Sequence, residues 1–483
     1  MNYINCPPNA YALMDSTRSM GYTLETAIAD VMDNSIAGKA SHIDIHYFHN
    51  PQEYISILDD GEGMDQEQMI AAMQYGGQGT GRKREQHDLG RFGLGLKTAS
   101  LSQCNRLTVI SKTSNGQTAG CRWDLSYIAQ TAATGSWNLQ ILSLNEINEV
   151  PRADKLCTMT SGTLVVWEDL EPMKQGQDDA KYILSEKMEH VESHIALTFH
   201  RYLAGEADLA PLKIRINEHD IQPADPFFHG DKFAPTTLLL PGKVMLTTYL
   251  MPFPSKLTEE EKNHLGRTKD MRQNQGFYVY RNKRLIQWGK WYRLLTKDKI
   301  TEIMRFQLDL PNDTYIDKEW MLDVKKSQTS PPRLMRDILR KICERIHDDV
   351  KGRWIKHDGD QPDHKQEIPL WQRWPVNDKV VYKINPDHPL IENIREYLPR
   401  KSMKDDFAQL LRLMEKTLPL HQLTLDCEHD CMDDDNQLTQ EEAEQYLRDY
   451  LGKCEPADRE KRKQILRMVE PFCQYPDIFE RMQ

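Results

Sequence analysis

Apolar residues recur every three or four positions from Leu24 to Ile36, and this spacing predicts an amphipathic helix. The same spacing predicts helices over residues 180–202 and 333–354, and helical patterns return after residue 390. Short β-prone runs lie between the first two helices, at residues 43–47, 55–58, 106–110 and 162–167. Helices and strands that alternate in this way predict a helical layer on one sheet over residues 24–170.

Strand patterns resume after Pro211. Residues 213–217 alternate between polar and apolar, and two β-prone runs, 276–281 and 284–286, flank a tight turn at Asn282 and Lys283. We therefore expect an α+β protein in three parts. These are an α/β two-layer sandwich over residues 1–205, a second domain over residues 206–332, and a mainly helical C-terminal region over residues 333–483.

Composition narrows the class of protein. The chain has 483 residues, of which 28% are charged, and a net charge of −11, which argues against tight autonomous binding to nucleic acid. Nine cysteines are scattered without the spacing of a disulfide framework, and the first residues lack a signal pattern. No apolar run reaches 18 residues. We expect a soluble, cytoplasmic protein with reduced cysteines and no membrane segment.

Candidate chemistry begins on the first helix. Asp30 and Asn34 are four residues apart, so their side chains lie one above the other on the same face. An acid and an amide stacked in this way can serve one metal-bound phosphate. On a single helix the pair is more often a solvated face, so it needs support from elsewhere in the chain.

That support comes from two glycine patterns. The strand at 55–58 ends in Asp59, and Gly61 and Gly63 follow, so the backbone there can approach a flat ligand closely. Residues 90–95 form a Gly-x-x-Gly-x-Gly run before a predicted helix, whose N–H groups can face phosphate oxygens. The run lacks the spacing of the dinucleotide-binding motif. Each pattern alone is common, but their order and separation are informative.

The helix with an acid and an amide, then Asp-x-Gly-x-Gly, then a glycine-rich run, then Gly162-Thr163 before a β-prone run, resembles the GHKL (Bergerat-fold) ATPases. This family includes gyrase B, MutL, MORC proteins, histidine kinases and a heat-shock chaperone. The later strand pair, with Asn282-x-Arg284-x-Ile286, resembles the transducer domain of MORC-like and MutL-like members, a domain of ribosomal-protein-S5-like type. The resemblance covers about residues 20–330 and suggests a prokaryotic source.

The resemblance implies a role for each motif residue. Asn34 would coordinate Mg²⁺ bridging the ATP phosphates, Asp59 would accept a hydrogen bond from the adenine amino group, and Thr163 would share a water beside it. Residues 75–89 would form the lid over ATP, with the composition a mobile closing loop needs. The remaining nucleotide-binding residues would be Gly61, Gly63, Met64, Gly90, Arg91, Phe92, Gly93, Leu94, Gly95, Lys97 and Thr98.

Two catalytic candidates follow. Hydrolysing relatives usually have glutamate four residues before the asparagine, where this chain has Asp30, which is one methylene shorter. We expect Asp30 to act as the general base of a slow Mg²⁺-dependent ATPase, with an ATP switch that binds without hydrolysing as the alternative. In the family, a transducer lysine reaches the γ-phosphate. Lys326 is the candidate, and Lys325 is the next.

Two functions remain open. The first is a clamp on DNA that forms a homodimer when ATP binds, as in restriction or phage defence, supported by basic residues of the second domain and of the helix from Arg333. The second is a regulatory switch whose output is a protein partner at the C-terminal region. The basic residues of the second domain behind the first hypothesis are Arg281, Lys283, Arg284, Lys290 and Arg293.

Three other patterns receive no role. His190, His194 and His200 lie on a charged predicted helix and are expected at its surface. The cysteines and histidine of residues 427–431 suggest zinc, but no second closely spaced pair follows. The acidic residues 433–436 suggest calcium, but the glycine that an EF-hand turn requires is missing, which leaves a solvated loop.

Overall fold

The computed structural model forms two compact units, residues 1–344 and 345–483. It describes residues 4, 8–18, 21–49, 52–75, 95–131, 137–170, 180–206, 209, 212–227, 235–252, 274–298, 300–323, 328–356, 368–376, 379–420, 423, 438–452 and 459–481. Three predicted site segments therefore lie partly or wholly outside the described residues: most of the lid, the run Gly90, Arg91, Phe92, Gly93 and Leu94, and the lysine pair Lys325 and Lys326.

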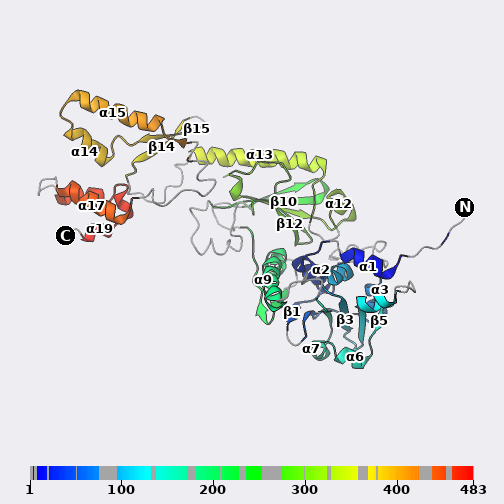
Figure 1. Cartoon of the computed structure of the whole chain (residues 1–483). Helices are drawn as coiled ribbons and strands as arrows, with labels where there is room; N and C mark the ends of the chain where they lie inside the picture. Colours follow the sequence, from blue (N-terminus) through cyan, green and yellow to red (C-terminus); the bar gives the residue numbers. More distant parts are fainter. Residues whose placement is uncertain are drawn as a thin grey trace. The chain divides into compact units, whose positions relative to one another are not determined.

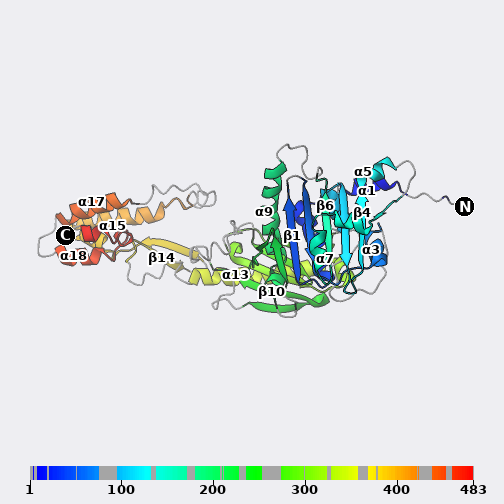
Figure 2. The same cartoon turned by 90° about the horizontal axis from the view of Figure 1, so that it is seen from below.

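An eight-stranded sheet organises the first part of the chain (Figures 1 and 2). Its order is β5 (Gln140–Ile141), β4 (Thr118–Asp124), β3 (Arg106–Lys112), β6 (Gly162–Glu168), β2 (Tyr54–Asp59), β1 (His42–Phe48), β7 (Lys213–Ile216) and β8 (His219–Asp220). Neighbouring strands are antiparallel except β1 and β7. The centre of the sheet pairs strands that are distant in sequence, because β6 lies between β2 and β3.

Alternating side chains give this sheet two apolar faces. One face packs on helices α1 (Ala10–Arg18), α2 (Leu24–Ala37), α3 (Gln66–Met73), α4 (Gly95–Gln103), α5 (Leu125–Gln130) and α9 (Ala180–Thr198). Its buried residues include Ile57, Val109 and Trp167. The opposite face packs Leu58 and Ile110 against the short helices α6 (Leu144–Asn148) and α7 (Ala153–Thr158). The predicted helical layer on one sheet is confirmed, and the smaller layer behind it was not predicted.

A five-stranded mixed sheet follows, in the order β12 (Arg284–Lys290), β11 (Gly276–Arg281), β13 (Met304–Leu310), β10 (Val244–Leu250) and β9 (Thr236–Leu240). The pair β11 and β13 is parallel and the other neighbours are antiparallel. The predicted turn between β11 and β12 is confirmed, since Asn282 and Lys283 both adopt positive φ, as a two-residue hairpin turn requires. The short elements η2 (Pro241–Lys243), η4 (Thr301–Ile303) and α12 (Thr314–Glu319) complete this region.

Two connections differ from the simplest division of the chain. The strand expected to open the second domain, β7, pairs with β1 and extends the first sheet. The helical pattern over 180–202 becomes two helices, α9 and α10 (His200–Leu203). Helix α13 (Arg333–Lys356) confirms the pattern over 333–354 and includes the boundary between the two compact units.

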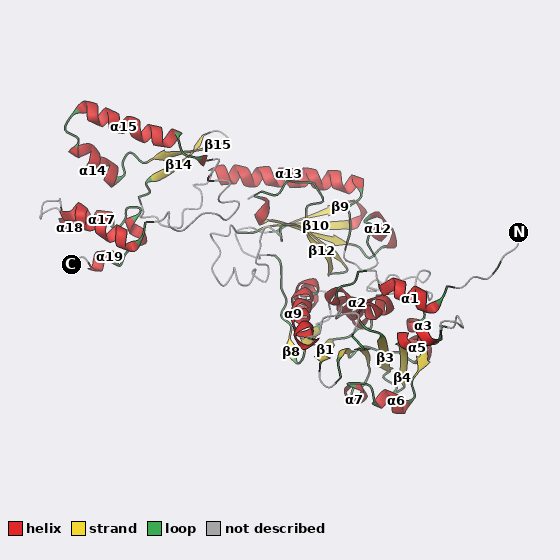
Figure 3. Cartoon of the chain, viewed as in Figure 1, coloured by secondary structure: helices red, strands yellow, loops and turns green. Residues whose placement is uncertain are grey.

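The second unit combines helices with one hairpin, coloured by secondary structure in Figure 3. The hairpin strands β14 (Trp371–Val376) and β15 (Lys379–Ile384) were not predicted. The other elements are α14 (Pro389–Tyr397), α15 (Lys401–Lys416), α17 (Gln440–Gly452), α18 (Arg459–Leu466), η6 (Phe472–Gln474) and α19 (Ile478–Arg481). Leu447, Leu466 and Phe472 lie in its apolar core. Among the described residues, no helix is long and apolar enough to cross a bilayer.

Candidate nucleotide site

Helix α2 presents one exposed and several buried polar side chains. Its start is fixed by a capping box in which Thr23 and Thr26 each donate a backbone N–H to the other's hydroxyl oxygen. Asp30 is 3% exposed, whereas Asn34, one turn later, is exposed. The Asn34 amide nitrogen donates to the Asp30 carbonyl at 3.1 Å, so the amide oxygen is the end left for a metal ligand.

Asp59, at the end of β2, is a buried carboxylate held from three sides. Its Oδ2 accepts from the Ser35 hydroxyl at 2.7 Å, and its Oδ1 accepts from the backbone N–H groups of Gly61 at 3.0 Å and Thr163 at 3.2 Å. Burial raises the pKa of the Asp59 carboxyl above its usual value, and these hydrogen bonds oppose that rise. The side chain is thus set rigidly where a flat polar ligand could meet it.

A serine on β3 joins the other predicted residues to this carboxylate. The Ser111 hydroxyl lies 2.8 Å from the Thr163 hydroxyl and accepts from the Met64 backbone N–H at 2.8 Å. It also lies 3.1 Å from the carbonyl oxygen of Gly162, to which it can donate. Hydrogen bonds therefore bring Asp59, Met64 and Thr163 together, and their contact with adenine stays a prediction. Ser35 and Ser111 were missed, although polar residues within apolar runs were the signal that could have indicated them.

The glycines around Asp59 are required by close backbone packing. A Cβ on Gly61 would lie 2.6 Å from the carbonyl oxygen of Gly38, and one on Gly63 would lie 2.0 Å from that of Lys112. Gly63 also has a φ of +73°, which glycine adopts most readily. The two glycines predicted from the motif thus let the turn after β2 pack directly against neighbouring backbone.

Asp30 lies beside the start of α4. A Cβ on Gly95 would lie 3.7 Å from Asp30 Oδ2, so the only predicted phosphate-binding glycine within the described residues approaches the candidate base. The Tyr22 hydroxyl donates to the same Oδ2 at 2.9 Å. Burial of the Tyr22 hydroxyl and the nearby charge of Asp30 raise the pKa of Tyr22, and Asp323 adds a smaller contribution. The Tyr22 hydroxyl therefore stays protonated and can donate to Asp30.

The next predicted phosphate ligands are buried. Lys97 is 2% exposed, and its ammonium donates to the carbonyl oxygens of Ala72 at 2.7 Å and Gln74 at 3.0 Å, at the end of α3. Burial lowers the pKa of Lys97 to about 8. Thr98 hydrogen-bonds to Tyr22. Both side chains thus support the helices on either side of the lid segment, and their contact with phosphate stays a prediction.

Magnesium suits these residues if it is held mainly by the nucleotide. Mg²⁺ prefers oxygen ligands and keeps several waters, with phosphates and one or two protein groups completing the octahedron. The amide oxygen of the exposed residue Asn34 fits that use. Within the described ranges, no group of three or more His, Cys, Asp or Glu side chains could hold a metal by itself.

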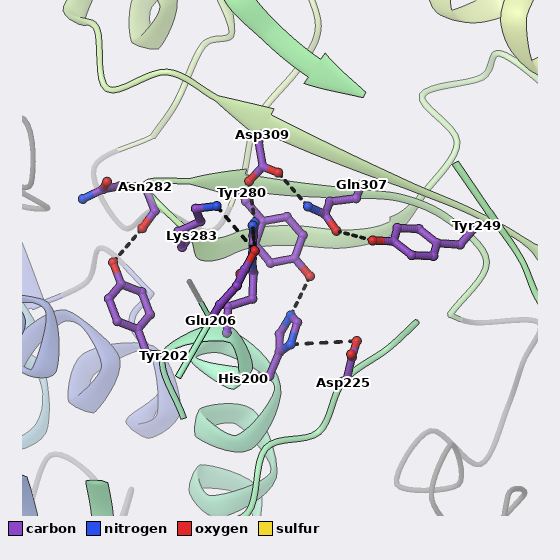
Figure 4. Close-up of polar contacts among 11 residues, drawn as sticks. His200, Tyr202, Glu206, Asp225, Tyr249, Tyr280, Asn282, Lys283, Gln307 and Asp309 are labelled. Atoms are coloured by element: carbon purple, nitrogen blue, oxygen red, sulfur yellow. Dashed lines mark hydrogen bonds and ion pairs between the residues drawn. The ribbon is translucent and has the colours of Figure 1, made fainter. Parts of the chain in front are cut away.

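Helix α10 and the residues after it are joined to the second sheet by a polar network, shown in Figure 4. His200 Nε2 lies 2.8 Å from the Tyr280 hydroxyl, and Tyr202 donates to the carbonyl oxygen of Asn282 at 2.6 Å. Arg201 pairs with Glu206 and Asp309. The expectation that His200 lies at the surface was wrong: it is 4% exposed, because tertiary packing places α10 against the second sheet.

The basic residues of the second domain differ in what they contact. Arg281 pairs with Asp317, with 2.8 Å between Nε and Oδ1, and Arg284 pairs with Asp33 at the same distance. Both arginines are at most 3% exposed, so their charge is turned to internal acids and they give the DNA hypothesis no support. Lys290 and Arg293 are exposed. An arginine on a strand can be buried when an acid from elsewhere in the fold pairs with it, and local sequence does not reveal that acid.

Comparison with known proteins supports the resemblance carried by the motifs. Residues 22–163 match the family model for histidine kinase-, DNA gyrase B- and HSP90-like ATPases. The match includes Asp30, Asn34, Asp59 and the start of α4, and it supports ATP binding by this part of the chain. No curated protein matches the chain.

Proposed function

We propose that this protein is a nucleotide-gated switch that binds Mg²⁺-ATP between α2, the end of β2 and the start of α4. The observation that carries the proposal is the buried Asp59 carboxylate, fixed by Ser35, Gly61 and Thr163 in a segment that matches GHKL ATPases. In the proposed complex, Asp59 accepts a hydrogen bond from the adenine amino group. Thr163 and Ser111 hold a water beside it.

The phosphates would extend from there toward Asn34 and Gly95. Asn34 would ligate Mg²⁺, which when bound offsets the charge of the phosphates. Asp30 would take a proton from the attacking water. Its short side chain is held by Tyr22 and lies near Gly95, so the reach is limited, and we propose slow turnover.

A lysine of the second domain would sense the γ-phosphate, with Lys326 preferred over Lys325. Its support is the resemblance to the transducer domain, and Asp323, two residues before Lys325, lies close enough to Tyr22 to contribute to the rise in the pKa of Tyr22. K326A should lose nucleotide-dependent dimerisation, and K325A should retain it. If K326A and K325A dimerise with nucleotide to the same extent, the preference for Lys326 over Lys325 is contradicted.

The nucleotide site is tested by calorimetric titration of ATP in Mg²⁺ buffer. D59N should weaken binding about tenfold or more, since hydrogen bonds to a charged group contribute about 1.5–3 kcal/mol. D60N is the matched control, because Asp60 instead accepts from Ser41 and His42. D30N should bind ATP normally and lose turnover by about 10² or more. Normal ATP binding by D59N, or unchanged turnover by D30N, would contradict the respective role.

We further propose that ATP closes two copies of the chain on each other, as a clamp on DNA in a process such as restriction or phage defence. Light scattering with a non-hydrolysable ATP analogue should show a dimer that is absent without nucleotide. DNA affinity should fall steeply with rising salt, because each neutralised phosphate releases counterions. A dimer without salt-dependent DNA binding would favour the second candidate.

That second candidate is a regulatory switch acting through a protein partner at the C-terminal region. Burial of Arg281 and Arg284 favours it, because these residues pair with internal acids rather than offering charge to DNA. Exposed basic residues that could still serve DNA are Lys290 and Arg293 and, on α13, Arg333, Arg340, Lys341, Arg345 and Lys351. On α13 these alternate with exposed Asp337 and Glu344, which lowers the positive potential of that helix.

A further inference from the structure

The tip of the β11–β12 hairpin touches the first domain through several consecutive residues. Tyr280 meets His200, the carbonyl oxygen of Asn282 accepts from Tyr202, and Lys283 Nζ lies 3.5 Å from Glu206 Oε1. Arg284 follows at the start of β12 and reaches helix α2. The same tip therefore contacts both the end of the first domain and the helix that carries the candidate base.

Arg284 is anchored by three groups. Its Nε donates to Asp33 Oδ1 at 2.8 Å, its Nη1 donates to the carbonyl oxygen of Leu285 at 3.4 Å, and its guanidinium lies 5.7 Å from the ring centroid of Phe199. With 3% of the residue exposed, the guanidinium has little freedom. Its Nη2 lies 3.6 Å from Asp30 Oδ1.

The Asp30 carboxylate is consequently held between two domains. Tyr22 donates to one oxygen from the first domain, and Arg284 approaches the other from the second. At 3.6 Å the contact is an ion pair rather than a good N–H···O hydrogen bond, so the attraction between Arg284 and Asp30 depends on how closely β12 lies to α2. Orientation of Asp30 thus depends on where the second sheet sits.

We propose that Arg284 is a positioning residue for Asp30, which orients the carboxylate and makes ATP hydrolysis depend on the placement of the second domain. The inference rests on the proposed function, in which Asp30 is the general base. In this proposal Arg284 acts through Asp30 and not by contact with the nucleotide. Asp33 holds the arginine, and the arginine in turn orients Asp30, so a change in domain angle alters turnover more than it alters ATP affinity.

The test compares R284K with R281K in the full chain. Both replace a buried arginine of the same hairpin by lysine, but Arg281 pairs with Asp317 inside the second domain, whereas Arg284 pairs with Asp30 and Asp33. We expect R284K to lower kcat about tenfold or more while the ATP dissociation constant stays within about threefold, and R281K to change kcat less than about twofold. Equal kcat values for the two variants would overturn the inference.

Two further variants keep the result interpretable. If R284K does not fold, D33N/R284M removes the anchoring charge pair together, and it should show the same loss of kcat with ATP binding retained. A wild-type kcat in that double variant would also overturn the inference. D30N separates failure of the proposed function from failure of the inference. If D30N retains turnover, Asp30 is not the general base and the inference falls with that role. If D30N loses turnover but R284K keeps it, only the inference about Arg284 falls.

Discussion

The Ser35 hydroxyl donates a hydrogen bond of 2.7 Å to Asp59 Oδ2, which joins helix α2 to the end of strand β2. One residue before Ser35 on the same helix is Asn34, the proposed magnesium ligand. The bond therefore sets the spacing between Asp59, proposed to bind adenine, and Asn34, proposed to bind the magnesium and phosphates.

S35A should lower the free energy of unfolding by about 1.5–3 kcal/mol, since it removes a hydrogen bond to a buried charged group. It should also weaken ATP binding. S41A is the control, because Ser41 donates to the neighbouring Asp60 at 2.6 Å on the less buried side of the turn. Urea unfolding and ATP titration of both variants check this, and a loss of ATP affinity in S41A alone would contradict it.

G61A should weaken ATP binding and destabilise the fold. Its Cβ would sit 2.6 Å from the carbonyl oxygen of Gly38, and backbone must move to relieve the clash. G352A is the control, since nothing lies within 4 Å of a Cβ there and Gly352 is inside α13. G352A should be neutral or up to about 1 kcal/mol more stable, the usual gain from alanine in a helix. Thermal unfolding and ATP affinity measure both.

Lys97 should make stability depend on alkaline pH. Its pKa is about 8 in the folded chain and about 10.4 when unfolded, so the unfolded state binds more protons between these values. Wild-type stability should therefore rise relative to K97M as pH increases from 8 to 10.4, by up to about 3 kcal/mol. Below pH 8 the difference should be flat. Urea unfolding across this range checks the prediction, and a constant difference would refute it.

The two ion pairs Arg281–Asp317 and Lys39–Glu62 should differ greatly in their effect on stability. In the first pair the side chains are 2% and 0% exposed, and in the second they are 68% and 65% exposed. R281M should cost about 3–5 kcal/mol, because it leaves Asp317 buried without its arginine. K39M should cost about 1 kcal/mol or less. Chemical denaturation of the two variants gives the comparison, and similar losses would contradict it.

Local sequence was sufficient to predict many of the helices and strands of the first domain. The apolar spacing from Leu24 to Ile36 became α2, and β1, β2, β3 and β6 formed where β-prone runs were predicted. The glycine positions after Asp59 were also readable, because only glycine fits a turn whose backbone packs on carbonyl oxygens. These features depend on residues close together in the chain.

Pairing between distant segments was not readable in the same way. Strand β7 (Lys213–Ile216) pairs in parallel with β1 (His42–Phe48), although more than 160 positions of the chain separate them. Arg284 and Asp33 are 251 residues apart, and a lone arginine on a strand resembles a surface residue until its acid is known. For the same reason the burial of His200 against Tyr280 was not anticipated.

The sequence by itself determined where the helices, strands and glycine turns of the first domain begin, and which residues carry the motifs proposed to bind a nucleotide, because periodicity and backbone freedom are local properties. Only the tertiary structure decided that Ser35 and Ser111 complete the Asp59 site and that Arg284 reaches Asp30 from another domain. Charge burial is the physical reason: a polar side chain can enter the interior only where the fold supplies its partner.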